Sequence, residues 1–314
     1  MKSSLFLIQL LIVASALTAD KRIIRDVDRF ELVYETTLPR LEQAGTMWIP
    51  LARTDAHQKF ELFSIASPVS WHKTRDTVHH NEMLVLQPGP SDHGKRITIR
   101  YQVTRLEKNS HAEAGNLSLH LKAEKLVPLN LRFIGIAREI TRNVKTDRAR
   151  GRALYDHVLA HMRYDQSGKG WGRGDALYAC DARTGNCTDY HAYFIALCRA
   201  IKIPARFAIG FTIPANRNKG IIKGYHCWAE FHAGDKWVPV DISEADKHPD
   251  LAGYYFGHHP ANRLELSRGR DITVKPAPKA GPFNYCFGPH LEVAGKPVPV
   301  KATFEFRRLP RNHD

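Results

Sequence analysis

The fold of this chain is decided by residues 185–199, which read Gly185-Asn186-Cys187-Thr188-Asp189-Tyr190-His191-Ala192-Tyr193-Phe194-Ile195-Ala196-Leu197-Cys198-Arg199. A turn of small residues leads into a strongly helical run, and Cys187 falls at the junction. A thiol in the first turn of a helix lies near unpaired backbone N–H groups and the positive end of the helix dipole, which favour the thiolate. We therefore expect a helix that begins at Cys187, with this thiol placed as a nucleophile would be.

The composition is that of an ordinary globular protein with a basic bias. The chain has 314 residues, of which 43% are hydrophobic and 25% charged, enough for two modest domains or one large one. The formal charge is +14, but Lys and Arg are scattered and no aromatic residues alternate with them. We therefore expect no specific nucleic-acid partner, and a general attraction to anionic material of the cell envelope.

Residues 1–16 have the pattern of an export signal. Lys2 precedes an apolar run from Leu5 to Val13, and Ala14-Ser15-Ala16 supplies the small residues of a cleavage site. The run is too short to span a bilayer, and no later stretch reaches eighteen apolar residues. We expect an exported protein, periplasmic or extracellular, with no stable membrane insertion after removal of the signal.

The segment 20–126 indicates a β-rich N-terminal domain. Apolar Ile97, Ile99, Tyr101 and Val103 alternate with polar residues, as in a strand with one face on a core. Shorter runs of this kind occur at residues 30–36, 47–51, 60–65 and 83–86, separated by clusters of Pro, Gly, Asp and His. Several short strands between turn signals predict a small antiparallel β-sandwich.

After a linker that ends near residue 130, the pattern changes to mixed helix and strand. Spacings of three and four predict an amphipathic helix over residues 148–162. Strands are predicted at residues 207–213, 225–231, 237–242 and 298–306. The glycine-rich segment 167–174 is spaced unlike a phosphate loop, so we interpret it as a mobile flap beside a site.

Three residues of this second segment form a candidate catalytic set. On the predicted strand 225–231, His226 shares a face with Trp228 and Glu230, while Cys227 points the other way and is expected to point away from the Cys187 thiol. A hairpin would bring Asp241 onto the same face as His226. A cysteine gains nucleophilicity from an imidazole that accepts its proton, and a carboxylate on the other ring nitrogen orients that imidazole. Cys187, His226 and Asp241 could supply these three roles.

Four separated motifs resemble the transglutaminase-like superfamily. They are Gly185-Asn186-Cys187 at the start of a helix, Ile203-Pro204-Ala205-Arg206, His226-Cys227-Trp228-Ala229-Glu230 and Trp237-Val238-Pro239-Val240-Asp241. The resemblance covers about residues 131–260, and the nearest likeness is to exported bacterial members with a β-rich N-terminal region. It implies an α+β, papain-like core, in a catalytic domain over residues 131–306, with Cys187, His226 and Asp241 as the triad. No acidic calcium loop is recognisable, so calcium activation is not implied.

Several residues have alternative interpretations. His191, one helical turn from Cys187, is a rival base, although its depth along the helix favours packing. Trp171 is a weak candidate for a second oxyanion donor beside the Cys187 backbone N–H, and Trp228 could either wall the site or pack in the core.

The remaining cysteines could form a disulfide, and two further histidines could bind a metal. Cys180, Cys227 and Cys286 could include a disulfide, whereas Cys198 is expected in the core. His157 and His161 have metal-ligand spacing but lack the glutamate of a zinc-protease motif, so no metal and no cofactor are expected.

The expected reaction is cysteine-dependent acyl transfer on amide or peptide bonds through a thioester. Hydrolysis of a peptide or protein substrate, by a peptidase or amidase, is favoured. One alternative is a protein-glutamine gamma-glutamyltransferase that cross-links proteins. An alternative of another class is a non-catalytic envelope binding or assembly module that uses the β-rich half as its partner surface.

Overall fold

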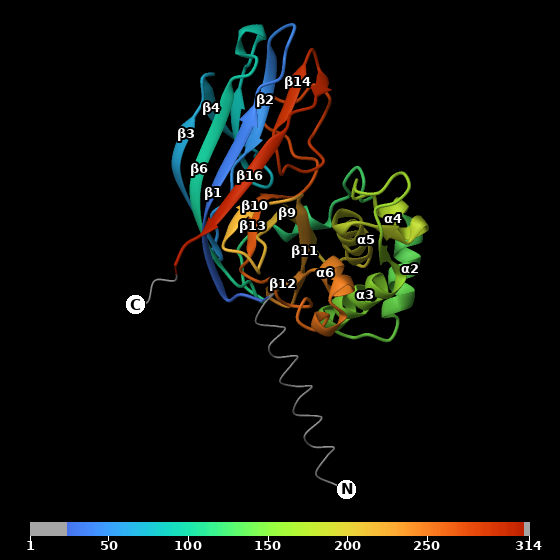
Figure 1. Cartoon of the computed structure of the whole chain (residues 1–314). Helices are drawn as coiled ribbons and strands as arrows, with labels where there is room; N and C mark the ends of the chain where they lie inside the picture. Colours follow the sequence, from blue (N-terminus) through green and yellow to red (C-terminus); the bar gives the residue numbers. More distant parts are fainter. Residues whose placement is uncertain (1–23, 311–314) are drawn as a thin grey trace.

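A computed structural model describes residues 24–310 of the chain, so the predicted export signal lies outside the described residues. Two five-stranded antiparallel sheets pack face to face as a β-sandwich (Figure 1). The first sheet has the order β10 (Lys219–Ile221), β16 (Ala302–Arg308), β1 (Val27–Thr37), β6 (Arg96–Leu106) and β3 (Gln58–Ala66). The second has the order β15 (Lys296–Val298), β14 (His290–Val293), β2 (Gly45–Pro50), β5 (Glu82–Leu86) and β4 (Trp71–Arg75).

The alternating pattern of the sequence produces the core of this sandwich. Ile97, Ile99, Tyr101 and Val103 of β6 are buried, as predicted, and pack in one cluster with apolar residues of the second sheet. β4 was not predicted, because all its residues are exposed or half-buried and no apolar alternation marks it.

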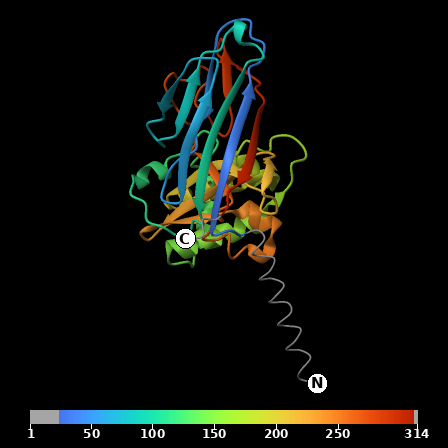
Figure 2. The same cartoon turned by 60° about the vertical axis from the view of Figure 1, so that its left-hand side comes forward.

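The sandwich is built from both halves of the chain. β16 pairs with β1 along its length, with Leu32 opposite Phe306, and the two strands run side by side in Figure 2. β10, β14 and β15 also belong to the sandwich sheets. The predicted division into residues 20–126 and 131–306 therefore does not coincide with the sheets: the last strand, expected in the catalytic segment, completes the sandwich.

The second half of the chain forms an α+β unit with a smaller, four-stranded sheet. Its antiparallel sheet has the order β12 (Lys236–Val240), β11 (His226–Ala233), β9 (Ala205–Thr212) and β13 (Arg263–Arg268). Around it lie α2 (Leu131–Thr141), α3 (Asp147–His161), α4 (Ala176–Ala182), α5 (Cys187–Ala200) and α6 (Ile242–Lys247). The parallel pair β7 (Arg163–Tyr164) and β8 (Thr184–Gly185) and three 3-10 turns, η1 (Pro90–Asp92), η2 (Leu117–Leu121) and η3 (Pro249–Leu251), complete the elements. The predicted α+β class is confirmed.

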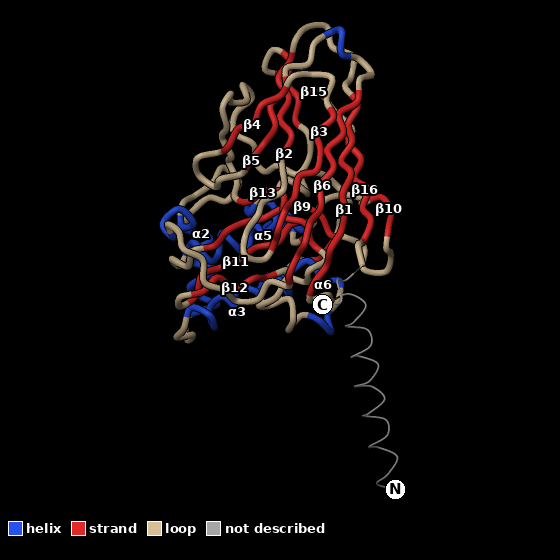
Figure 3. The backbone as a smooth tube through the Cα atoms, turned by 90° about the vertical axis from the view of Figure 1, so that its left-hand side faces the viewer, coloured by secondary structure: helices blue, strands red, loops and turns tan. Residues whose placement is uncertain are grey.

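The four-stranded sheet lies between the helices and the sandwich, as Figure 1 shows from the side and Figure 3 from the side of the sandwich. One of its faces packs on α5, all 14 residues of which are buried. The other face presents Glu230, together with Glu265, to Lys108, which follows β6. The Lys108 Nζ lies 3.4 Å from Glu230 and 3.5 Å from Glu265, and all three side chains are buried. A buried charge network thus joins the sandwich to the back of the sheet. No helix within residues 24–310 has both the length and the apolar character needed to cross a membrane.

Candidate active site

The start of α5 is fixed by its own sequence. Asn186 is the N-cap, and its Oδ1 accepts a hydrogen bond of 2.9 Å from the Thr188 backbone N–H. The carboxylate of Asp189 reaches back to the Asn186 N–H at 3.0 Å, which completes a capping box. Gly185 has a φ of +153°, and a Cβ there would lie 2.5 Å from the Asp189 carboxylate, so only glycine fits. Cys187 is thereby the first helical residue, 2% exposed.

The glycine-rich segment is tied to this helix start. Asp189 accepts hydrogen bonds from the backbone N–H groups of Gly172 (2.7 Å) and Gly174 (3.0 Å). On the opposite side, Arg270 donates to the Gly174 carbonyl (2.6 Å) and Tyr285 donates to the Gly172 carbonyl (2.7 Å). Residues 172–174 therefore form a fixed wall beside Cys187, which differs from the predicted mobile flap.

His226 and Asp241 come from neighbouring strands and meet as the hairpin geometry predicts. His226 begins β11, Asp241 follows β12, and His226 Nε2 lies 2.7 Å from Asp241 Oδ2. Asp241 is also the N-cap of α6, where its Oδ1 accepts hydrogen bonds from the Glu244 N–H and the Ser243 hydroxyl, both at 3.1 Å. The helix start and the hairpin thus fix both oxygens of one carboxylate. Because Nε2 is engaged with Asp241, Nδ1 is the ring nitrogen that remains for Cys187.

The electrostatics of the three residues favour a thiolate–imidazolium pair. Burial opposes ionisation of Cys187, but hydrogen bonds from Cys227 and His226, with the charge on His226, hold the pKa of its thiol well below the ordinary value. Burial also opposes the charge on His226, yet the charge and hydrogen bond of Asp241 raise the pKa of this imidazole to about 9. Both shifts keep the proton on the imidazole and off the sulfur near neutral pH.

A residue that the sequence did not predict contacts the carboxylate of Asp241. Arg263, the first residue of β13, places its Nη2 2.6 Å from Asp241 Oδ2, the oxygen that also binds His226. Burial raises the pKa of Asp241, but the charges of His226 and Arg263 outweigh it and hold this pKa well below the ordinary value. No motif marks Arg263, because its partner is distant in sequence and its position is set by the sheet order.

His191, the rival base, has both ring nitrogens engaged by the backbone. Its Nδ1 lies 2.7 Å from the Cys187 carbonyl oxygen, and its Nε2 accepts the Ile242 N–H at 3.1 Å. Only the tautomer with a proton on Nδ1 satisfies both bonds. Burial lowers the pKa of His191, in keeping with a neutral ring. His191 therefore links α5 to α6, and no nitrogen remains to accept the thiol proton.

Cys227 lies where the sequence did not predict it. Its thiol shares a hydrogen bond with Cys187, and its Sγ is 3.7 Å from His191 Nδ1. The expectation that it points away from Cys187 is wrong, because the β11 face that carries Cys227 and Phe231 is the one that packs on α5. All five cysteines are free and buried in the structure, so none of the considered disulfides is formed. Burial raises the pKa of Cys198 and of Cys286, whereas the pKa of the Cys187 thiol is lowered.

The two tryptophans singled out from the sequence occupy different environments. Trp171 is half-buried on the glycine-rich segment, and no hydrogen bond of its indole is found within residues 24–310. Trp228 is fully buried, with its ring centroid 6.0 Å from that of His226 and 5.2 Å from the Arg263 guanidinium carbon, so it lies beneath the site. The Cys187 backbone N–H, at the first helical position, has no intrahelical acceptor and remains a candidate oxyanion donor.

The pair of histidines at metal-ligand spacing contacts protein groups. His157 Nε2 lies 3.0 Å from the Tyr193 hydroxyl, and His161 Nε2 lies 3.2 Å from the Cys180 carbonyl oxygen. Over the described part of the chain, no group of three or more His, Cys, Asp or Glu is arranged to hold a metal ion.

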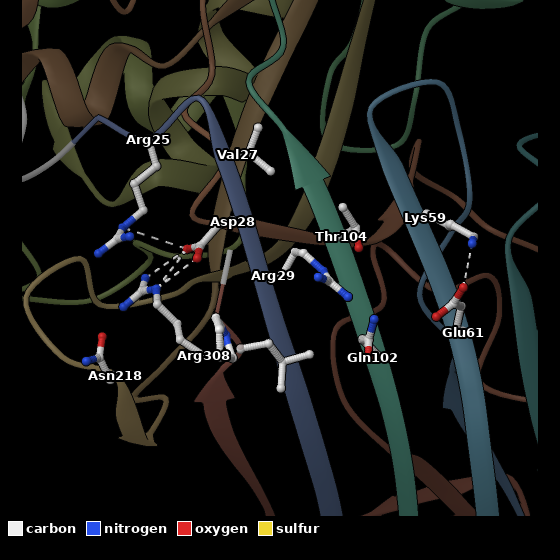
Figure 4. A pocket seen from close by; sticks show the side chains of 12 residues that line it. Arg25, Val27, Asp28, Arg29, Lys59, Glu61, Gln102, Thr104, Asn218 and Arg308 are labelled. Carbon is white, nitrogen blue, oxygen red and sulfur yellow. Dashed lines mark hydrogen bonds and ion pairs between the residues drawn. The ribbon is translucent and has the colours of Figure 1, made fainter. Parts of the chain in front are cut away.

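A separate hollow of about 700 Å³ lies on the sandwich (Figure 4). Its charged side chains pair with one another: Arg308 binds Asp28 through two nitrogens at 2.9 Å, and Lys59 pairs with Glu61. The hollow is not lined by Cys187, His226 or Asp241.

Comparison with known proteins identifies the domain that carries the site. Residues 134–242, which include Cys187, His226 and Asp241, match the model of the transglutaminase-like superfamily. This segment is therefore similar to the transglutaminase-like superfamily, as the four motifs indicated. An uncharacterized protein of Haemophilus influenzae is 31% identical over 178 residues, which are 46% of this chain and 48% of that protein. The chain thus spans about half the length of this curated relative.

A solved structure shares the fold at low sequence identity. A "putative cysteine protease" from Cytophaga hutchinsonii superposes with a TM-score of 0.62 over 92% of this chain and 93% of that one, at 13% identity. This likeness shows that the sandwich and the α+β unit occur together in another protein. The periplasmic domain of TgpA from Pseudomonas aeruginosa is less similar, with a TM-score of 0.40 and 19% identity over 74% of this chain and 95% of that one.

Proposed function

We propose that this protein catalyses acyl transfer on amide or peptide bonds through a thioester on Cys187, with water as the acyl acceptor. The observation that carries the proposal is a thiol at a helix start whose neighbouring imidazole is held by a buried carboxylate at 2.7 Å. In this arrangement Cys187 is the nucleophile, His226 accepts the proton and Asp241 orients His226.

The steps follow from the positions of the protons. The Cys187 thiolate attacks the amide carbonyl carbon, and the Cys187 backbone N–H stabilises the resulting oxyanion. The tetrahedral intermediate collapses when the His226 imidazolium gives its proton to the leaving amine, which leaves a thioester and a neutral imidazole. His226 then takes a proton from water as the water attacks the thioester. Collapse of the second intermediate releases the carboxylic acid and restores the thiolate and the imidazolium.

The location of this activity is part of the proposal. The export signal predicted in residues 1–16 supports action outside the cytoplasm, in the periplasm or beyond the cell. The basic charge supports contact with anionic envelope material, and the substrate would be a peptide or protein found there.

Iodoacetamide labelling near neutral pH tests whether Cys187 is activated. We expect wild type to incorporate one label at Cys187, at least about tenfold faster than a free cysteine, because only the thiolate reacts. Cys187→Ala should lose this label, whereas the matched variant Cys198→Ala, which changes a buried thiol further along the same helix, should retain it. A Cys187 no more reactive than free cysteine would contradict the proposal.

The acyl acceptor is tested separately with amide and glutamine-containing peptides, with and without a primary amine, against Cys187→Ala. Release of carboxylic acid without amine incorporation is expected. Ammonia release accompanied by incorporation of the amine would replace hydrolysis by cross-linking. Labelling of Cys187 without turnover of any peptide in the panel would favour the binding-module alternative.

A further inference from the structure

Arg263 is a buried cation that forms an ion pair with a single carboxylate. Its side chain is 1% exposed, and Asp241 is the one carboxylate within ion-pair distance of it among the described residues. Its Nε and Nη1 have no hydrogen-bond partner in the described structure, and its guanidinium lies over the Trp228 ring at 5.2 Å. The other buried arginines of β9 and β13 differ, because Arg206 and Arg268 each contact two or more carboxylates of the network that joins the sheet to the sandwich.

The position of Arg263 makes it a competitor of His226. Arg263 Nη2 and His226 Nε2 lie 2.6 and 2.7 Å from the same oxygen, Oδ2 of Asp241, while Oδ1 serves the start of α6. One oxygen therefore shares its negative charge between two cationic groups. A carboxylate that served His226 alone would retain the imidazolium proton more strongly, and a proton held too strongly is poorly donated to a leaving group.

We propose that Arg263 is a positioning residue that fixes Asp241 Oδ2 against His226 and limits how strongly Asp241 retains the imidazolium proton. The proposal rests on the proposed function, in which His226 must both accept and return a proton. Arg263 does not touch the reacting atoms and acts through Asp241.

Other groups around the pair are accounted for. The charged or ionisable neighbours with electrostatic influence on His226 or Asp241 are Cys187 and His191 from α5, Cys227 from β11, Glu244 and Lys247 from α6, and His259. Tyr155 from α3 and Tyr255 also interact electrostatically with Asp241, and both stay protonated, since burial raises the pKa of each. In addition to these neighbours, Arg263 is the permanently charged cation that contacts Asp241 directly.

The test measures the proton affinity of His226 directly. NMR titration of ¹³C-histidine-labelled full-length protein, with the His226 signal assigned by its absence in His226→Gln, is compared for wild type, Arg263→Gln and Arg263→Lys. We expect the midpoint to move upward by roughly one pH unit in Arg263→Gln, because a nearby positive charge is lost, and to stay near wild type in Arg263→Lys. Arg308→Gln, which removes the partner of buried Asp28 in the sandwich, is the matched control and should leave the midpoint unchanged.

A second comparison covers the case in which Arg263→Gln does not fold. Asp241→Asn/Arg263→Gln removes both charges of the pair, so neither Asp241 nor Arg263 is left as a buried ion without its partner. Its His226 midpoint should lie above that of Asp241→Asn alone, in which the cation faces the imidazole uncompensated. Equal midpoints in either comparison would overturn the role of Arg263. Failure of wild-type Cys187 to label with iodoacetamide would instead overturn the proposed function, so the two failures are distinguishable.

Discussion

The backbone N–H of Ile242 donates a hydrogen bond to Nε2 of His191 at 3.1 Å, and this nitrogen also lies 3.9 Å from Asp241 Oδ1. The histidine nearest to Cys187 in sequence thus joins the helix of the thiol to the helix that Asp241 caps. Its function is to hold two elements together at the distance that the site requires.

His191→Ala is expected to destabilise the fold while leaving a base beside the thiol. It removes two buried hydrogen bonds and leaves a cavity, so the free energy of unfolding should fall by about 3 kcal/mol. Urea unfolding measures this loss, and iodoacetamide labelling of the folded fraction should still single out Cys187. Complete loss of labelling in folded protein would indicate that His191 is the base after all.

Asp241→Asn should lower amide turnover by about 100-fold to 10,000-fold, because an amide neither stabilises the imidazolium nor fixes the required tautomer. Ser243→Ala is the matched control, since it removes one hydrogen bond to the other oxygen, Oδ1, and should cost less than about tenfold. Single-turnover rates with a peptide substrate compare the two variants. Similar losses in both would argue against a special role for Oδ2.

The pH dependence of acyl-enzyme formation should be bell-shaped. Its acid limb reflects the lowered pKa of Cys187, and its alkaline limb should fall near pH 9, where His226 loses the proton that the leaving group needs. Stopped-flow rates from pH 4 to pH 11 locate both limbs. A profile that rises without limit above pH 9 would contradict the role of His226 as acid.

The same shift affects stability. Because the pKa of His226 rises from 6.5 to about 9 on folding, its contribution to the free energy of unfolding is fully present below pH 6.5 and is lost as the pH rises through 9. His226→Gln should remove this part of the pH dependence, which urea unfolding at several pH values can measure.

Asp189→Ala should loosen the wall beside the thiol. The carboxylate accepts three backbone N–H groups, from Gly172, Gly174 and Asn186, and its loss leaves them without an acceptor. We expect a loss of about 3 kcal/mol in the free energy of unfolding and faster hydrogen exchange of the Gly172 and Gly174 amides. Asp165→Ala, at an exposed turn just before the glycine-rich segment, should change stability by less than about 0.5 kcal/mol. Unchanged exchange in Asp189→Ala would mean that other contacts hold this wall.

Lys108→Met should weaken the junction between the sandwich and the sheet. Lys108 is fully buried among Asp55, Glu230 and Glu265, so its loss leaves buried carboxylates with less positive charge and should cost about 3 kcal/mol or more. The exposed pair of Lys59 and Glu61 provides the control, because Lys59→Met should cost less than about 1 kcal/mol. Urea unfolding compares both variants with wild type, and equal stabilities would mean that the network is dispensable.

Local patterns were sufficient to predict much of this molecule. The period-two run in β6, the capped start of α5 and the β11–β12 hairpin each depend on residues close in sequence, and the hairpin alone brings His226 to Asp241. Arg263 and the Cys227 contact could not be predicted in this way. Arg263 reaches Asp241 through sheet order, and the face of β11 that covers α5 is decided by packing between distant elements. β16 was predicted as a strand, but its partner β1 is nearly a whole chain away.

The pairing of β16 with β1 also determines when folding of the sandwich can be completed. Until residues 302–308 are available, β1 lacks one neighbour and the apolar face that includes Phe30, Leu32 and Tyr34 is incompletely covered. Closure of such a long loop is slow, and the unclosed sheet edge is open to wrong pairing. The segment that carries Cys187 is synthesised before this closure, so the thiol-bearing unit exists for a time beside an unfinished sandwich. We therefore expect a chain without residues 302–308 to leave the sandwich behind the site incomplete.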